Sequence, residues 1–160
     1  MSRPAYITVR ANFPTVLRYP HRQLLEDVLG WSDLVKNPSF VDTCAMRVSV
    51  ALVKSGVSLI GARMKGTGGL VKGKTIEPGH AKLSHILRRI WGKPEIYSSE
   101  TAARDGIDKR SGVVSFFRIH PEMRSAQGHI DLVDPRTNGF SECATQCYFQ
   151  SAQIWFWPLK

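Results

Sequence analysis

The chain has 160 residues, of which 42% are hydrophobic and 22% are charged. This hydrophobic content can form a core, and the charged residues form no long block of one sign, so a disordered chain is excluded. Lys and Arg number 22 against 13 Asp and Glu, which gives a formal net charge of +9 and favours a polyanionic partner. The length predicts a single domain over residues 1–160.

Several classes of protein are not expected from the sequence. No nucleic-acid-binding motif occurs and the basic residues are scattered, so a nucleic acid partner is not predicted. No run approaches the ~18 apolar residues that would insert into and span a membrane, and no signal peptide follows Met1. We therefore expect synthesis in the cytoplasm of the producing cell. His80 and His85 lack other ligands at metal-binding spacing, so we expect them at exposed or loop-facing positions and predict neither metal nor cofactor.

The first forty residues predict short elements separated by prolines. Residues 6–13 fit a short helix or an irregular lead-in, and residues 23–29 fit a short helix that ends at Gly30. Because a proline disfavours helix at the residue before it, residues 37–42 are expected to be extended.

Residues 42–52 (DTCAMRVSVAL) predict a helix that begins at a cysteine. Asp42 or Thr43 can cap its first N–H groups. Cys44 then lies in the first turn, where the positive end of the helix favours a thiolate and lowers the thiol pKa from about 8.5. Arg47 would add to this effect if it pointed toward the sulfur. The alternative is that Cys44 is a small buried residue of a core helix.

The middle of the chain predicts one further long helix. Residues 57–60 fit a short strand, and the glycine-rich residues 61–79 a mobile surface loop. Residues 80–91 carry apolar side chains at i, i+3, i+4, i+7 and i+8, the pattern of an amphipathic helix. Residues 93–111 are polar and fit a connection with a turn.

Three strands are predicted after this helix, over residues 112–120, 128–133 and 153–157, with Pro158 ending the last one. Helices followed by a meander of strands predict an α+β fold, in which helices pack on one side of an antiparallel sheet.

A histidine opens the second of these strands. Gly128 permits a close backbone approach, and the strand would hold the ring of His129 rigidly. A strand-borne histidine that faces the helix-borne Cys44 has the arrangement of a thiol enzyme, with helix N–H groups available to an oxyanion. An ordinary half-buried histidine is the alternative.

Three motifs, in order along nearly the whole chain, resemble those of the type VI secretion amidase effectors of family four. They are residues 42–52, residues 128–132 (GHIDL), and residues 143–147 (CATQC) followed by an aromatic strand at 154–159 (IWFWPL).

This resemblance implies a papain-like, NlpC-type fold with the nucleophile Cys44 at a helix N-terminus and His129 as base and acid. It implies an antibacterial toxin that the type VI apparatus delivers into the periplasm of a rival cell. There such enzymes cut peptidoglycan stem peptides between D-glutamate and meso-diaminopimelate. It also implies a cognate immunity protein that plugs the cleft.

The CATQC motif carries two expectations. The spacing of Cys143 and Cys147 permits a disulfide or a pair of thiols near a metal, and the resemblance implies a disulfide that forms after delivery. In the family, the third catalytic residue is an aspartate inside this loop, whereas this chain has Thr145 there.

Another residue must therefore orient the histidine. Asp131 shares a strand face with His129 at i+2 and is our candidate, with Asp134 and Glu142 as alternatives. Residues 134–139 are predicted to form an extended turn.

Two other functions fit the sequence. A non-catalytic module could use the positive charge to bind an anionic polymer, and a papain-like acyltransferase or deamidase could use the same Cys44 and His129. For the leading hypothesis, residues 61–79 and 93–111 are expected to line the substrate groove.

Overall fold

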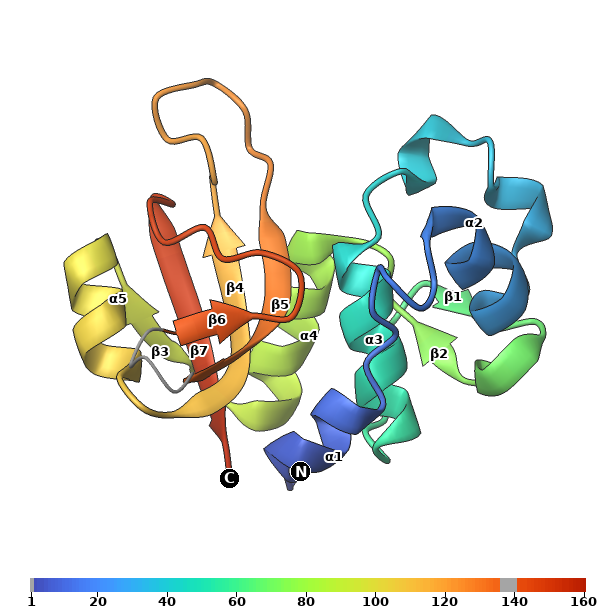
Figure 1. Ribbon diagram of the computed structural model, residues 1–160, viewed down its shortest axis with the longest axis horizontal. Helices are drawn as coiled ribbons and strands as arrows, with labels where there is room; N and C mark the ends of the chain where they lie inside the picture. Colours follow the sequence, from blue (N-terminus) through green and yellow to red (C-terminus); the bar gives the residue numbers. More distant parts are fainter. Residues whose placement is uncertain (1, 136–140) are drawn as a thin grey trace.

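The computed structural model describes residues 2–135 and 141–160 and has an α+β fold (Figure 1). The regular α-helices are α1 (Tyr6–Ala11), α2 (His21–Gln23), α3 (Cys44–Lys54), α4 (His80–Trp91) and α5 (Glu100–Ile107). The short η elements are the π-helix η1 (Leu24–Leu29) and the 3-10 helices η2 (Ser32–Leu34), η3 (Pro38–Phe40) and η4 (Gly69–Val71). The strands are β1 (Met64–Lys65), β2 (Thr75–Ile76), β3 (Glu95–Tyr97), β4 (Ser111–Phe117), β5 (His129–Pro135), β6 (Ser141–Cys143) and β7 (Gln153–Leu159).

The main sheet is antiparallel, with the strand order β3-β7-β4-β5-β6. The predicted meander is therefore wrong in one respect, because the last strand inserts between β3 and β4. Four consecutive buried residues, 154–157, fill both faces of β7, which makes it a central strand. Pro158 does not end β7: it lies opposite Gly112, one residue before the end of the strand.

Helices cover both faces of this sheet. On one face, α3 and α4 pack against Val113, Ile130 and Trp155. On the other face, α5 packs against the residues that alternate with these, including Val114 and Phe156. The expectation of helices on a single side is thus corrected, since β4 and β7 are apolar on both faces and both must be buried.

The predictions for α3 and α4 are confirmed, and that for α4 is correct to the residue. The helix predicted at 23–29 is present as α2 and η1, and it ends at Gly30 in the left-handed conformation, with φ 74°. Residues 37–42 are not extended throughout. Asn37 is extended, whereas residues 38–40 form the 3-10 helix η3, which the Asn37 side chain caps by accepting a hydrogen bond from Ser39 N at 2.9 Å.

Three connections differ from expectation. Residues 57–60 form no strand: Val57 N closes the end of α3 on Leu52 O. Residues 93–111 contain β3 and α5, because Ser99 caps α5 and the sheet takes β3 as its edge strand. The predicted turn at 134–139 lies largely outside the described residues, and its first two residues end β5.

The glycine-rich segment 61–79 is an ordered hairpin of β1 and β2 rather than a simple loop. Its glycines permit close packing on η1. A Cβ at Gly69, where φ is 64°, would lie 2.1 Å from the carbonyl oxygen of Asp27. The glycines of this segment thus allow its backbone to contact the backbone of η1 directly.

Glu77 fastens this hairpin to the core. Its side chain has 0% exposure and accepts hydrogen bonds from the N–H groups of Arg63 and Gly79 and from the Arg63 guanidinium. Its backbone exchanges two hydrogen bonds with Ser49 Oγ on α3.

We predict that Glu77→Ala lowers the free energy of unfolding by about 3 kcal/mol, because it leaves buried N–H groups without acceptors. Urea unfolding of wild type and variant measures this. Glu26→Ala, which removes an exposed i,i+4 pair with Arg22, is the control and should change the value by no more than about 0.5 kcal/mol. Equal effects of the two substitutions would contradict the role given to Glu77.

Candidate functional site

Cys44 is the first residue of α3, with its side chain almost enclosed. Asp42 Oδ1 accepts a hydrogen bond from the backbone N–H of Cys44 at 3.1 Å, so Asp42 provides the expected cap. Thr43 makes no cap bond; its hydroxyl accepts from Arg47 Nε at 2.9 Å. The helix therefore starts at the cysteine because Asp42 satisfies its first free donor.

The expectation of a lowered thiol pKa is wrong for the unliganded chain. Burial is the largest effect and raises the pKa of Cys44, and the negative charges of Asp42 and Asp131 raise it further. A hydrogen bond from the backbone N–H of Ile130 acts in the opposite direction and is outweighed. Arg47 is not among the groups that shift this pKa. The partial charge of the helix end thus cannot compensate for desolvation, so Cys44 rests as a thiol.

His129 opens β5 and lies in an aromatic pocket. Its ring stacks on Phe116, the residue opposite it on β4, with centroids 6.2 Å apart. The ring of Tyr148 packs edge-on against it at 5.1 Å. The imidazole Nε2 lies 2.8 Å from Asp131 Oδ2. These contacts fix the ring plane and leave Nδ1 as the nitrogen with no protein hydrogen bond among the described residues.

Asp131 is fully buried on β5, and its carboxylate accepts four hydrogen bonds. Three of them come from backbone N–H groups, those of Leu132 at 2.8 Å and of Thr145 and Gln146 at 3.0 Å each. The fourth bond joins it to His129. Because these amides can only donate, the oxygens of Asp131 act as acceptors, and the proton shared with His129 belongs to Nε2. Nδ1 of the neutral ring therefore carries a lone pair that can take a proton.

The loop that donates two of these bonds is closed by a disulfide. Cys143 and Cys147 are joined, with Cα atoms 5.2 Å apart. Thr145, inside this loop, contributes its backbone N–H to Asp131. Of the alternative orienting residues, Asp134 accepts a hydrogen bond from Tyr6 at 2.9 Å, and Glu142 lies opposite Asp134 on β6.

Cys44 and His129 line one cavity of ≈ 230 Å³. Its other lining residues come from three segments: Val16, Val41, Asp42, Thr43, Arg47, Thr145 and Tyr148. The predicted groove lining is thus wrong, because neither 61–79 nor 93–111 reaches this cavity. The loop before α2, the start of α3 and the disulfide loop meet there instead.

The sequence did not predict that His80 lies close to His129. This side chain is half-buried, and its Nε2 lies 2.7 Å from Ser115 Oγ. Its ring abuts Gly128, where an added Cβ would come within 2.2 Å of it. Burial, followed by the nearby charge of His129, lowers the pKa of His80 to about 4. Gly128 is the feature of the sequence that could have indicated this contact, because its lack of a side chain leaves room for the His80 ring next to His129.

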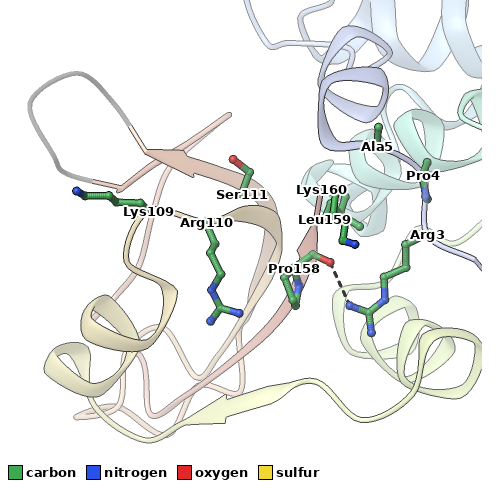
Figure 2. A pocket seen from close by; sticks show the side chains of 9 residues that line it. All are labelled: Arg3, Pro4, Ala5, Lys109, Arg110, Ser111, Pro158, Leu159 and Lys160. Carbon is green, nitrogen blue, oxygen red and sulfur yellow. Dashed lines mark hydrogen bonds between the residues drawn. The ribbon is translucent and has the colours of Figure 1, made fainter.

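A larger cavity, of ≈ 890 Å³, lies elsewhere. Figure 2 shows its basic lining: Arg3, Lys109, Arg110 and Lys160, around the start of β4 and the end of β7. The strand register places it at the opposite end of β4 from Phe116 and His129. It is therefore separate from the cavity at Cys44.

Within residues 2–135 and 141–160, no three His, Cys, Asp or Glu side chains converge in a way that could hold a metal ion. No helix in the same residues has the length and apolar character needed to cross a bilayer.

A sequence profile of the type VI secretion system amidase effector protein 4 family, Tae4, matches residues 40–157. The chain belongs to this family. It is accordingly an amidase effector of the type VI secretion system, and the Cys44–His129 cavity lies within the matched region. No curated protein sequence matches the chain.

Solved Tae4 structures share this fold. The Tae4–Tai4 effector-immunity complex from Enterobacter cloacae superposes with a TM-score of 0.73 at 20% identity, over 99% of this chain and 100% of that one. Tae4 alone from the same organism gives 0.73 at 21% identity, over 99% and 98%. The Tae4–Tai4 complex from Salmonella Typhimurium gives 0.69 at 17%, over 99% and 100%. The α+β, papain-like fold expected from the resemblance is confirmed.

We predict that Asp42→Asn raises the rate at which iodoacetamide alkylates Cys44 at pH 8, by up to about tenfold. The substitution removes one of the charges that raise the thiol pKa and keeps an oxygen for the cap. In wild type the rate should still be rising above pH 8.5, since burial holds the thiol protonated.

Asp33→Asn on η2 is the control, because Asp33 is not among the groups that shift the Cys44 pKa, and it should leave the rate unchanged. A wild-type rate that is already constant below pH 7 would show a resting thiolate and contradict this account.

Proposed function

We propose that this Tae4 family member is a cysteine amidase that cuts the peptide stems of peptidoglycan. The observation that carries the proposal is a single cavity that contains Cys44 and His129, with Asp131 bonded to the far nitrogen of the histidine. A thiol, a base and a group that orients the base are the parts that acyl transfer to water requires.

The resting thiol sets the order of steps. As Cys44 attacks the amide carbon, its proton passes to Nδ1 of His129, because Nε2 already carries the hydrogen shared with Asp131. The imidazolium is stabilised by the Asp131 carboxylate and then protonates the leaving amine. Water, deprotonated by His129, hydrolyses the thioester and regenerates the thiol.

In this mechanism the N–H groups at the N-terminus of α3, where Cys44 lies, would stabilise the oxyanion. Asp42 covers the Cys44 N–H in the unliganded chain. Its side chain is exposed, so the N–H can be released to a substrate oxygen by rotation of one side chain.

For the bond cut, we propose the amide between D-glutamate and meso-diaminopimelate, as the family resemblance implies. The net charge of +9 fits an anionic wall polymer. Export by the type VI apparatus into the periplasm of a target cell agrees with the oxidised Cys143–Cys147 pair, because disulfides persist in that compartment.

We also propose that a cognate immunity protein covers the cavity. The solved complexes pair Tae4 with Tai4. In this chain the apolar side chains of Val16 and Val41 line the cavity although they are 49% and 68% exposed, and Leu17 beside them is 92% exposed. Exposed apolar groups at the mouth of a cavity are typical of a protein-binding rim.

Cys44→Ala should abolish cleavage of purified Gram-negative sacculi and leave the thermal unfolding midpoint within a few degrees. Mass spectrometry of the soluble products tests both chemistry and bond. Wild type should release a fragment ending in D-glutamate and one beginning with diaminopimelate, and the variant neither.

The basic cavity of Figure 2 favours the second candidate function, a module that only binds an anionic polymer. That function predicts binding to sacculi that falls steeply with salt, does not depend on Cys44 and releases no fragments. Retained cleavage by Cys44→Ala would overturn the amidase mechanism, and binding without cleavage by wild type would favour the binding module. Transfer to an added amine in place of hydrolysis would favour the acyltransferase.

Asp131→Asn should lower kcat by about 10²–10⁴-fold. The amide oxygen would take the place of Oδ2, which accepts from Thr145, Gln146 and His129, so the ring tautomer is kept but the negative charge that stabilises the imidazolium is lost. The variant should also unfold more easily, because three backbone N–H groups lose a charged acceptor. Dividing kcat by the fraction of folded protein separates the loss of activity from the loss of stability.

Asp134→Asn, on the same strand but bonded to Tyr6, is the matched control and should change kcat less than about twofold. Similar losses of kcat in both variants would remove Asp131 from the mechanism.

A further inference from the structure

Arg47 is a buried cation with no acidic partner. Its residue exposure is 2%, and it lies one turn after Cys44 on α3. No carboxylate within the described residues forms an ion pair with it. Burial lowers the pKa of its guanidinium, and no acidic side chain acts to raise it again. A guanidinium nevertheless remains protonated in proteins, so the chain holds an uncompensated positive charge at this position.

The hydrogen bonds of Arg47 account for three of its five donors. Nε donates to Thr43 Oγ1 at 2.9 Å, and the two hydrogens of Nη1 go to the carbonyl oxygens of Pro14 at 2.9 Å and Tyr19 at 2.8 Å. All three acceptors are neutral. The two hydrogens of Nη2 have no acceptor among the described residues.

Nη2 is not fully enclosed by the protein. Among the described residues, one fully enclosed side-chain polar atom lacks a hydrogen-bond partner, and it is Trp91 Nε1. Arg47 Nη2, which also has no acceptor, therefore keeps some exposed surface. Arg47 also contributes to the lining of the cavity that contains Cys44 and His129. A ligand that entered this cavity would thus meet two N–H donors on a buried cation.

The site is suited to one carboxylate. Hydrogen bonds from a desolvated guanidinium to an anion are stronger than those to a neutral group. The other charged groups at the cavity are carboxylates: Asp131 is satisfied by its four hydrogen bonds, and Asp42 acts on Cys44 and His80. A substrate carboxylate would therefore be directed to Arg47.

The proposed substrate carries such a group close to its scissile amide. D-Glutamate joins diaminopimelate through its side-chain carboxyl, so its α-carboxylate stays free, four carbon–carbon bonds from the scissile carbon, or about 5 Å when extended. Arg47 follows Cys44 by one turn of α3 and lines the same cavity, so a substrate whose carbonyl lies at Cys44 would have its α-carboxylate in the cavity that Arg47 borders.

We propose that Arg47 determines substrate specificity by binding, through Nη2, the free α-carboxylate of the D-glutamate whose side-chain amide Cys44 attacks. This inference rests on the proposed function and specifies, in addition, which stem peptides the enzyme cuts. Stems in which that carboxylate is amidated to D-isoglutamine offer no charge to Arg47 and are poor substrates.

The test compares two soluble muropeptides that differ in this one group, D-isoglutamate and D-isoglutamine, with wild-type enzyme. A hydrogen bond to a charged group contributes about 1.5–3 kcal/mol, so kcat/KM should be about 10–150-fold higher for the acid. The difference should lie mainly in KM. Equal kcat/KM for the two substrates would overturn the inference, whereas cleavage of neither would overturn the proposed function itself.

Arg47→Gln then assigns the preference to this side chain. Its acid-to-amide ratio should fall to within about threefold of one. Because the ratio is measured within one preparation, a smaller folded fraction does not affect it. Arg22→Gln, which removes an exposed arginine outside the cavity, should keep the wild-type ratio. A ratio retained by Arg47→Gln would show that another group binds the carboxylate.

Discussion

The buried carboxylate of Asp131 is the group on which the site depends. It lies in the middle of β5 without exposure to solvent, and burial of an ionised carboxyl is costly unless its oxygens are hydrogen-bonded. Here Leu132, Thr145, Gln146 and His129 supply four donors. The same bonds hold the CATQC loop against β5 and fix the tautomer of His129. Closure of so small a loop by a disulfide contributes about 2 kcal/mol by chain entropy, so its larger effect is to keep two amides directed at Asp131.

Burial also decides the state of the nucleophile. The N-terminus of α3 favours a thiolate, but Cys44 is desolvated and lies near two carboxylates, which together raise its pKa. In the proposed mechanism, proton transfer to His129 then accompanies attack on the substrate. The raised pKa would also slow oxidation and alkylation of Cys44, because the thiolate is the reactive form. Asp42 adds to this effect through its charge.

Charge is distributed unevenly between the two ends of the sheet. The basic cavity at the end of β7 is lined by two lysines and two arginines, of which Arg110 is paired with Glu95. The cavity at Cys44 contains one buried guanidinium, whose remaining donors can hold a single carboxylate. Under the proposed function, the first cavity would hold the anionic wall polymer and the second would select the bond that is cut. From the sequence, Arg47 could be expected only to lower the pKa of Cys44. It is not among the groups that shift this pKa, and three of its donors bind Thr43, Pro14 and Tyr19 instead.

The sequence by itself determined the elements whose signals are local. The apolar periodicity of residues 80–91 and the cap and cysteine at residues 42–44 placed α4 and the start of α3, and the alternation in β5 put His129 and Asp131 on one face. What the tertiary structure decided depends on partners distant in the chain. Insertion of β7 between β3 and β4, the covering of both sheet faces and the hairpin at 61–79 follow from long-range burial, which local patterns do not encode. The same holds for the raised pKa of Cys44, the amides of Thr145 and Gln146 on Asp131, and the position of Arg47, because each is set by desolvation and by contacts that exist only after the chain has folded.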